Sequence, residues 1–305
     1  IRISRWGRSP YETDAHIHDE VARLGHLARV LPMHHDAEVV VVTSKNPIGR
    51  DQLLAMPSVR LVLTTTSGFD HLDLTALQAK GIVAARCPAA RRDAVVDSAL
   101  GLILSGLRAL GPLRAAAVQG RWARAALPGM RMRTLRGARV GVVGLGVIGR
   151  RMAEVLTVLG AEVVGADPLG VPETVVPMDL NDMLAQCDAV TVHCRLERGS
   201  SGLIGPAQLA DCGPGLVLVN TARGDVLDVR AAVELLESGR LHALGLDVFP
   251  QEPWPELQKV RDLPGLIELP HAAGYHDGLS AAVTTELCAA VEAFVGGRGV
   301  PHRLC

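Results

Sequence analysis

The sequence lacks the features that would direct it to a membrane or along a secretory pathway. No apolar run approaches the roughly eighteen residues that a membrane-spanning helix needs. The first ten residues, IRISRWGRSP, contain no apolar core of signal-peptide length. The six cysteines form neither a CxxC motif nor a cysteine–histidine spacing typical of metal sites, so we expect reduced thiols and no metal. Together these absences predict a cytoplasmic protein.

The sequence also has no large excess of positive or negative charge. The 305 residues include 31 lysines and arginines and 32 aspartates and glutamates, which gives a formal net charge of -1. Without a basic surplus, nothing in the composition favours binding to nucleic acid or to an anionic membrane. Only Lys45, Lys80 and Lys259 are lysines, which we attribute to the coding bias of a GC-rich genome. We therefore expect a small molecule as the ligand.

Short apolar runs alternate with longer amphipathic stretches along most of the chain. In the first series we expect strands at 38–43, 60–64 and 82–85 and helices near 50–57, 73–80 and 93–110. In a second series we expect strands at 139–143, 162–166, 188–193, 215–219, 242–247 and 266–269, and a final helix at 280–296. Such alternation is typical of α/β domains with parallel sheets, and the length fits two of them. Residues 111–138 interrupt the pattern and are interpreted as a connecting arm or an oligomer contact.

A glycine-rich turn stands at the start of the second series. Gly144, Gly146 and Gly149 form a GxGxxG motif between an expected strand and a helical pattern, which is the context that makes the motif informative. The first glycine allows a tight turn, the second lets the backbone approach a pyrophosphate, and the third lets helix and strand pack closely. The pyrophosphate of a dinucleotide would then lie at the helix N-terminus, where free N–H groups favour negative charge.

An acidic residue follows this turn at the end of the next expected strand. Asp167 stands eighteen positions after Gly149, where a carboxylate would accept hydrogen bonds from both ribose hydroxyls of NAD. It would also repel the additional phosphate of NADP, and neither Pro168 nor Leu169 offers a compensating positive charge. The pattern therefore predicts NAD as the cofactor. The alternative is a glycine turn with an unrelated acid at a strand end.

Polar side chains follow three further expected strands. Arg223 comes after the run 215–219, Asp247 and Glu252 after 242–247, and His271 after 266–269. In an open parallel sheet, ligands bind beyond the carboxyl ends of the strands.

These side chains suit the reduction of a 2-keto acid. A guanidinium binds a carboxylate and polarises the adjacent carbonyl, and a histidine delivers a proton as hydride arrives. A carboxylate beside that histidine fixes its tautomer and favours its charged form. Taken singly, His271 fits an ordinary loop residue better than a catalytic one, and Glu252-Pro253 fits an ordinary turn better than part of a site.

Five segments, spread over about residues 60 to 290, resemble the D-isomer-specific 2-hydroxyacid dehydrogenase family. They are SGFDHLD (67–73), GLGVIG (144–149), VNTARGDVLD (219–228), GLDVFPQEP (245–253) and LPHAAGY (269–275). The resemblance implies that Arg223 binds and activates the substrate, that His271 is the acid/base and that Glu252 is its partner. It also implies that Asp247 holds the nicotinamide amide.

The same resemblance assigns the substrate carboxylate to the backbone N–H groups of Ser67 and Gly68. The full set of expected cofactor contacts comprises Gly144, Gly146, Val147, Ile148, Gly149, Asp167, Cys194, Thr221, Ala222, Arg223, Asp247, His271 and Gly274. The implied activity is the NAD-dependent interconversion of a small 2-keto acid and its D-2-hydroxy acid.

The resemblance also implies a domain arrangement. It predicts two Rossmann-like or flavodoxin-like, doubly wound domains with the active site in a cleft between them. An NAD-binding domain at 93–276 would be inserted into a substrate-binding domain formed by 1–92 and 277–305. Such enzymes are typically homodimers.

Several departures from the family pattern resemble the subgroup that contains the C-terminal-binding proteins, which are NAD-sensing corepressors. These are Asp97-Ser98 in place of Ala-Glu, His193-Cys194-Arg195 in place of HxP, and the segment CPAA at 87–90. The alternative function is therefore an NAD(H)-sensing dimeric scaffold. Against close identity, Gly274 replaces the aromatic residue of those corepressors, which leaves more room over the substrate. Phosphite oxidation is disfavoured because that activity uses a lysine at the position of Ser67.

Arg91 and Arg92 leave two interpretations open. By resemblance, Arg91 would lie at the cleft mouth, facing the side-chain end of the substrate. The pair is either solvated, or Arg91 binds a second anionic group of the substrate, a carboxylate or a phosphate.

Overall fold

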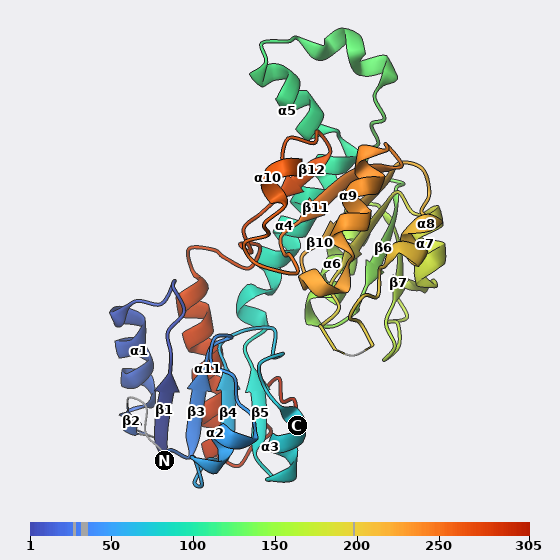
Figure 1. The fold of residues 1–305 in the computed structure, drawn as a ribbon. Helices are drawn as coiled ribbons and strands as arrows, with labels where there is room; N and C mark the ends of the chain where they lie inside the picture. The colour runs from blue at the N-terminus through green and yellow to red at the C-terminus, as the bar shows by residue number, and fades with distance from the viewer. Residues whose placement is uncertain (27–28, 32–35, 198) are drawn as a thin grey trace. The chain divides into compact units, whose positions relative to one another are not determined.

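The computed structural model describes residues 1–26, 29–31, 36–197 and 199–305. The chain divides into two compact units (Figure 1). Unit 1 consists of Ile1–Arg91 and Tyr275–Cys305, and unit 2 is the continuous segment Arg92–Gly274. Each unit contains a parallel sheet covered by helices on both faces, which confirms the predicted α/β class.

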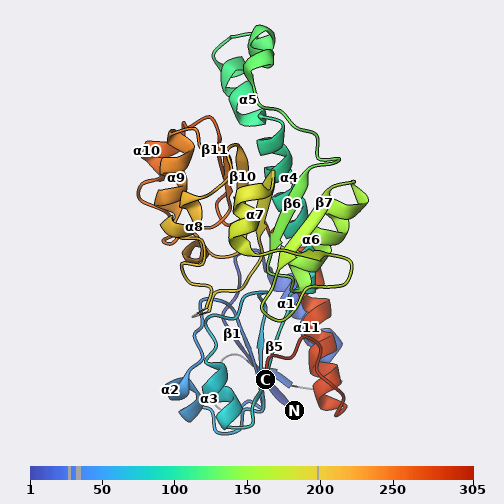
Figure 2. The ribbon, with the colours of Figure 1, turned by 90° about the vertical axis from the view of Figure 1, so that its right-hand side faces the viewer.

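The sheet of unit 1 has five parallel strands in the order β2-β1-β3-β4-β5. The strands are β1 (Arg2–Trp6), β2 (Arg29–Leu31), β3 (Val39–Val42), β4 (Leu61–Thr64) and β5 (Val83–Arg86). Helices α1 (Asp14–Leu24) and α11 (Leu279–Val295) cover one face, and α2 (Arg50–Leu54) and α3 (Leu74–Ala79) cover the other (Figure 2). Alternate valines of β3 enter the two opposite cores, so the strand is apolar throughout, as expected for a strand buried on both faces.

The first strand and helix of unit 1 were not predicted from the sequence. β1 reads RISRW, and its polar residues give it no recognisable strand pattern in the sequence. In the sheet it nevertheless lies between two other strands. Ser4 is fully buried, and the Arg5 side chain, only 7 % exposed, forms ion pairs with Glu12 and Glu20. A polar strand can therefore occupy a central position here because carboxylates from the following segment neutralise its arginine.

The sheet of unit 2 has seven parallel strands in the order β12-β11-β10-β9-β6-β7-β8. They are β6 (Arg139–Val143), β7 (Glu162–Ala166), β8 (Val176–Pro177), β9 (Ala189–Val192), β10 (Leu216–Asn220), β11 (Leu241–Leu246) and β12 (Leu266–Glu268). One core packs α4 (Ala89–Leu107) and α6 (Val147–Val158) on the sheet, and the other packs α7 (Leu180–Gln186), α8 (Pro206–Ala210) and α9 (Val229–Glu237) (Figure 2). Because β6 pairs with both β7 and β9, the strand order reverses direction there, and open α/β sheets bind their ligands at such a point.

The segment interpreted as a connecting arm forms α5 (Leu110–Val118) and a 3-10 helix, η1 (Ala123–Gly129). Trp122 is 88 % exposed and Val118 is 67 % exposed, so this segment leaves large apolar side chains uncovered. In the described part of the chain, no single helix has the length and apolar composition of a membrane span. α4 and α5 reach that length and apolar composition only when they are counted as one helix, although the chain bends by 71° between them.

Candidate functional site

The glycine turn of unit 2 is compact because two of its glycines are in close contact with backbone. Gly144 has a φ of +87°, and a Cβ there would lie 2.5 Å from the Cys194 nitrogen. At Gly149, a Cβ would lie 1.9 Å from the Gly144 carbonyl oxygen. A side chain at either position would therefore force apart the ends of β6 and β9 or the start of α6. This geometry matches the roles expected of the first and third glycines of the motif.

The second glycine has different surroundings. A Cβ at Gly146 would meet no heavy atom within 4 Å, and the residue is exposed as the N-cap of α6. Packing within the protein therefore does not explain why this position, Gly146, is a glycine. Val147 and Ile148 form the first turn of α6 and are half-buried. The open space above this helix start suits the close approach of a pyrophosphate.

Asp167 is held beside this turn by two backbone hydrogen bonds. One carboxylate oxygen accepts from the Leu145 N–H at 2.7 Å, and the other accepts from the Leu169 N–H at 2.8 Å. Because β6 and β7 are paired, the carboxylate lies next to the glycine turn and is fixed in orientation. Each oxygen retains a lone pair for a further hydrogen bond, as the expected ribose contact requires.

The segments that follow β9 and β10 carry buried polar atoms without partners in the described part of the chain. These atoms are His193 Nδ1 and Thr221 Oγ1. Burial lowers the pKa of His193 to about 4, so its ring is neutral at physiological pH. Burial also raises the pKa of the Cys194 thiol to about 11, so that group stays protonated.

Buried polar groups without partners are uncommon in folded proteins. Together with the open helix start at Gly146 and the fixed Asp167 carboxylate, they fit a dinucleotide bound at this edge of the sheet. In the sequence, His193 stands out only as a departure from the family pattern. Its place directly after β9 is the signal that marks it as a site residue.

The predicted acid–base residues follow three strands that the sheet places side by side. Arg223 follows β10, Glu252 follows β11 and His271 follows β12. The Nδ1 atom of His271 lies 2.7 Å from Glu252 Oε2, and Glu252 Oε1 accepts a hydrogen bond from the Phe249 N–H. His271 Nε2 has no partner among the described residues, and the His271 side chain is 48 % exposed. The pair therefore presents an oriented, accessible imidazole nitrogen.

Asp247 organises the loop that carries this histidine. Its carbonyl oxygen accepts from the His271 N–H at 2.8 Å, and its Oδ1 accepts from the N–H groups of Ala272 and Ala273. Asp247 is 2 % exposed, and burial raises its pKa despite the two N–H donors. These bonds hold His271 at a φ of +55°, which few non-glycine residues adopt. Gly274, half-buried, ends the same loop.

Arg223 is positioned by Asn220, the last residue of β10. The Asn220 side chain accepts from the Ala222 N–H at 3.0 Å and donates to the Arg223 carbonyl at 2.9 Å. Arg223 is half-buried, and its Nη1 donates to the Ala222 carbonyl at 2.8 Å. The buried asparagine thus fixes the backbone from which the guanidinium extends.

In unit 1, Ser67 and Gly68 lie in a braced loop after β4. Arg86 Nη1 donates to the Ser67 carbonyl, and Thr66 Oγ1 donates to the Gly68 carbonyl, both at 2.7 Å. The backbone N–H groups of Ser67 and Gly68 donate no hydrogen bond to any described residue. The loop therefore offers free N–H groups on a rigid backbone, as the predicted carboxylate site requires.

The two neighbouring arginines have different surroundings. Arg92 is paired with Asp93 at 2.9 Å, and Arg151 also contacts that carboxylate. Arg91 instead donates to the Thr65 carbonyl at 2.6 Å and to the Tyr11 hydroxyl. A solvated pair thus fits Arg92 and does not describe Arg91.

A comparison with protein-family models identifies the middle of the chain. Residues 100–273 match the model described as D-isomer specific 2-hydroxyacid dehydrogenase, NAD binding domain. The chain belongs to the D-isomer specific 2-hydroxyacid dehydrogenase family. The matched segment lies within unit 2 and contains the glycine turn, Arg223, Glu252 and His271. Unit 2 therefore contains the segment of this family member that matches the family's NAD binding domain.

Curated relatives and solved structures agree with this membership. D-3-phosphoglycerate dehydrogenase of Mycobacterium tuberculosis is 29 % identical over 271 residues, covering 87 % of this chain and 51 % of that protein. Hydroxypyruvate reductase of Thermotoga maritima is 29 % identical over 250 residues, covering 80 % of this chain and 79 % of that protein. The crystal structure of D-mandelate dehydrogenase from Rhodotorula graminis is similar with a TM-score of 0.86 and 26 % identity, covering 100 % of this chain and 97 % of that one. This chain spans about half the length of the D-3-phosphoglycerate dehydrogenases that it matches.

Proposed function

We propose that this family member is an NAD-dependent oxidoreductase that interconverts a small 2-keto acid and its D-2-hydroxy acid. The observation that carries the proposal is the His271–Glu252 pair, 2.7 Å apart, which leaves His271 Nε2 accessible. A protein that only sensed the cofactor would have no use for an oriented proton donor of this kind. The narrower resemblance to the C-terminal-binding proteins remains a prediction.

The proposed mechanism assigns one task to each residue. NADH, when bound, supplies a hydride to the keto carbon. Arg223 binds the substrate carboxylate and polarises the adjacent carbonyl. The N–H groups of Ser67 and Gly68 are proposed, from the family resemblance, as a carboxylate-binding element. His271 donates its Nε2 proton to the carbonyl oxygen, and Glu252 stabilises the imidazolium before that transfer. In the reverse direction His271 accepts the hydroxyl proton.

The cofactor is proposed to lie along the carboxyl edge of the unit 2 sheet. The glycine turn and the first turn of α6, with Val147 and Ile148, would hold the pyrophosphate, and Asp167 would hold the ribose. Further contacts are assigned to Cys194, Thr221, Ala222, Asp247 and Gly274. The free N–H groups at the start of α6 and the orphaned Thr221 hydroxyl support this placement.

The proposal is tested by a kinetic screen of 2-keto acids with NADH, ranked by kcat/KM. Glyoxylate, pyruvate and hydroxypyruvate form the core of the panel, and at least one should be turned over. Arg223→Ala should reduce kcat/KM by about a thousandfold, since Arg223 acts in both the ground state and the transition state. Arg230→Ala, an exposed arginine paired with Glu256, is the matched control and should change nothing.

Absence of turnover across a wide panel of 2-keto acids would refute the proposed enzymatic activity. Capture of a partner protein that requires NADH and occurs without turnover would establish the scaffold function instead.

Asp167 should make NAD(H) the preferred cofactor over NADP(H) by about tenfold or more in kcat/KM, on the order of 1.4 kcal/mol. The fixed carboxylate accepts from ribose hydroxyls and repels a 2′-phosphate. Asp167→Asn should shrink the preference, whereas Asp182→Asn, an exposed residue of α7, should leave it unchanged. Equal kcat/KM for the two cofactors in the unaltered protein would show that Asp167 does not contact the ribose.

Glu252→Gln should lower kcat for keto-acid reduction. The carboxylate accepts from His271 Nδ1 and so fixes the orientation and tautomer of the imidazole, whereas an amide can donate as readily as accept. Steady-state kcat measures the change, with Glu256→Gln as the control. An unchanged kcat would mean that Glu252 does not position His271 for proton transfer.

We further propose that the chain forms a homodimer through the exposed arm at 111–138. The uncovered Trp122 and Val118 side chains support this assignment. Sedimentation velocity should give the mass of a dimer, and Trp122→Ser should lower the dimer fraction.

A further inference from the structure

Arg91 carries a largely buried positive charge in unit 1 that no carboxylate neutralises directly. Its guanidinium carbon lies 5.1 Å from the centre of the Tyr11 ring, and its nitrogens donate to two neutral acceptors, the Thr65 carbonyl and the Tyr11 hydroxyl. No ion pair joins Arg91 to any described residue. Burial lowers the pKa of Arg91 to about 10. A largely buried charge without a direct ion pair is costly, so its presence calls for a use.

The carboxylate that influences Arg91 most is already engaged elsewhere. Glu286, on α11, accepts hydrogen bonds from the N–H groups of Ala89 at 3.1 Å and Ala90 at 2.9 Å. It also lies 3.3 Å from His302 Nε2. Glu286 therefore caps the first turn of α4, and its charge reaches Arg91 only through space. The remaining N–H groups of the guanidinium are left for an external acceptor.

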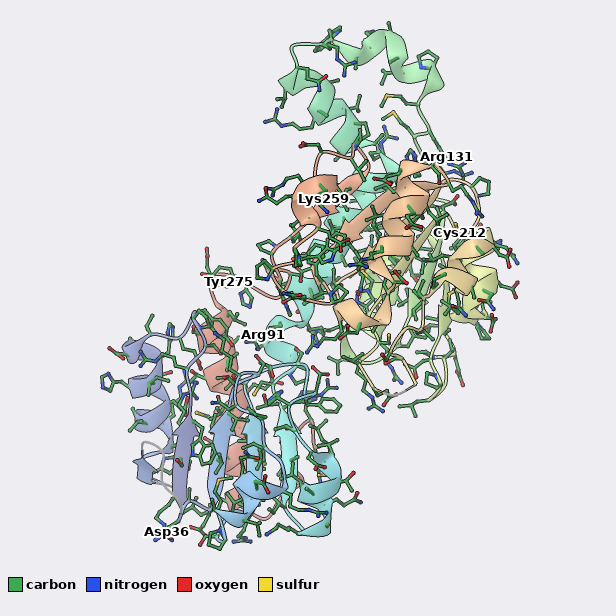
Figure 3. The ribbon with its side chains drawn as sticks, viewed as in Figure 1. Asp36, Arg91, Arg131, Cys212, Lys259 and Tyr275 are labelled. Carbon is green, nitrogen blue, oxygen red and sulfur yellow. The ribbon has the colours of Figure 1, made fainter. Side chains whose placement is uncertain are left out.

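Two buried hydroxyl groups without partners lie on the loop that Arg91 contacts. Thr65 is fully buried, and neither Thr65 Oγ1 nor Ser67 Oγ has a hydrogen-bond partner among the described residues. Arg91 binds the Thr65 carbonyl, so the guanidinium and this loop are locked together. The loop follows β4 and Arg91 follows β5, and these strands are neighbours. Figure 3 shows Arg91 beyond the carboxyl ends of the unit 1 strands.

We infer that Arg91, held by Tyr11 and accompanied by the hydroxyls of Thr65 and Ser67, forms an oxyanion subsite for the second anionic group of a dianionic 2-keto acid. That group is a distal carboxylate or phosphate. The inference rests on the proposed function and specifies its substrate class. The guanidinium supplies charge and parallel N–H donors, the hydroxyls supply donors that can rotate to the oxygens, and the Tyr11 ring keeps the guanidinium plane fixed.

The test compares substrates that differ only in their distal charge. For the carboxylate, 2-ketoglutarate is paired with 2-ketovalerate, a monoanion without a distal charge. For the phosphate, phosphohydroxypyruvate is paired with the monoanion hydroxypyruvate. In the unaltered protein, kcat/KM for at least one dianion should exceed that of its partner by about tenfold or more, as one added charge-assisted contact provides. The pair with the larger ratio identifies the anion. The ratio should fall with added salt to the extent that the contact stays open to solvent.

Three variants separate recognition from structure. Arg91→Gln should abolish the ratio while leaving kcat/KM for the monoanionic partner within about threefold of the unaltered value. Arg91→Lys keeps the charge without the planar fork and should retain part of the ratio. Arg92→Gln is the matched control, because this neighbouring arginine is paired with Asp93, and it should leave the ratio intact.

A binding measurement independent of turnover completes the design. Succinate or inorganic phosphate, compared with acetate at equal ionic strength, should raise the melting temperature of the unaltered protein and not that of Arg91→Gln. A higher kcat/KM for the monoanionic keto acids than for the dianions, or an equal loss of activity on all substrates in Arg91→Gln, would overturn the subsite while leaving the proposed function standing. If no keto acid is turned over, the proposed function fails by itself. The subsite then stands if the dianion raises the melting temperature through Arg91, and falls if it does not.

Discussion

Replacement of His271 by asparagine should lower kcat for keto-acid reduction by about 10²–10⁴-fold, the usual contribution of a positioned general acid. The imidazole is the one accessible proton donor proposed at the carbonyl oxygen, and asparagine does not deliver a proton. Asparagine is preferred to alanine because His271 has a φ of +55°, a region that asparagine adopts more readily than most residues. The loop held by Asp247 should therefore keep its shape.

The control for this variant is a histidine with no proposed role in the reaction. His18 is an exposed residue of α1 in unit 1, and His18→Asn should leave kcat unchanged. Fluorescence titration should give almost the same NADH affinity for His271→Asn as for the unaltered protein, because the change affects the transition state more than cofactor binding. A kcat near that of the unaltered protein would remove the acid/base assignment from His271.

Replacement of Arg5 by methionine should destabilise unit 1 by about 3–5 kcal/mol, the usual cost of removing one member of a buried ion pair. Arg5 pairs with Glu12 and with Glu20, at 2.9 Å for the latter, and all three side chains are at most 7 % exposed. Without the guanidinium, two carboxylates stay buried with no positive partner. The urea midpoint should fall accordingly, while Arg8→Met, which removes only an exposed ion pair with Asp14, should hardly change it.

The loss should also depend on pH in a defined direction. Burial is the main cause that raises the pKa of Glu20 above its ordinary value, with the charge of Arg5 opposing it. A carboxyl whose pKa is raised in the folded state stabilises the fold when protonated, and this stabilisation is lost as the pH rises through that pKa. Removal of Arg5 raises it further, so Arg5→Met should lose more stability at pH 8 than at pH 5. A pH-independent loss would mean that packing of the arginine stem, and not charge, accounts for it.

The arrangement of unit 2 could be predicted well because its chemistry follows from chain order. Apolar runs mark buried strands, and polar residues that directly follow such strands must lie at the carboxyl edge. Arg223, Glu252 and His271 were placed on this basis. The bond between His271 and Glu252 then follows from the pairing of β11 with β12 and from the turns after those strands.

Contacts between distant segments could not be predicted in this way. Tyr11 and Arg91 are 80 positions apart, and no local periodicity relates them. The same holds for β1, whose arginine is compatible with a central strand only because Glu12 and Glu20 lie over it. The hydrogen bonds from Ala272 and Ala273 to Asp247 likewise depend on the path of a loop, which residue types alone do not determine.

The division of unit 1 between two parts of the chain determines the order in which the two units can complete their folding during synthesis on the ribosome. Leu287 and Val291 of α11 pack in the same core as Ile3, Val39 and Leu61. That side of the five-stranded sheet is therefore covered only in part, by α1, until the whole of unit 2 has been translated. Unit 2, being continuous, completes its own core first, and the nascent sheet meanwhile exposes an apolar face of the kind that chaperones bind. The synthesis of α11 thus completes the cover of that face and ends the exposure of its apolar residues during biosynthesis.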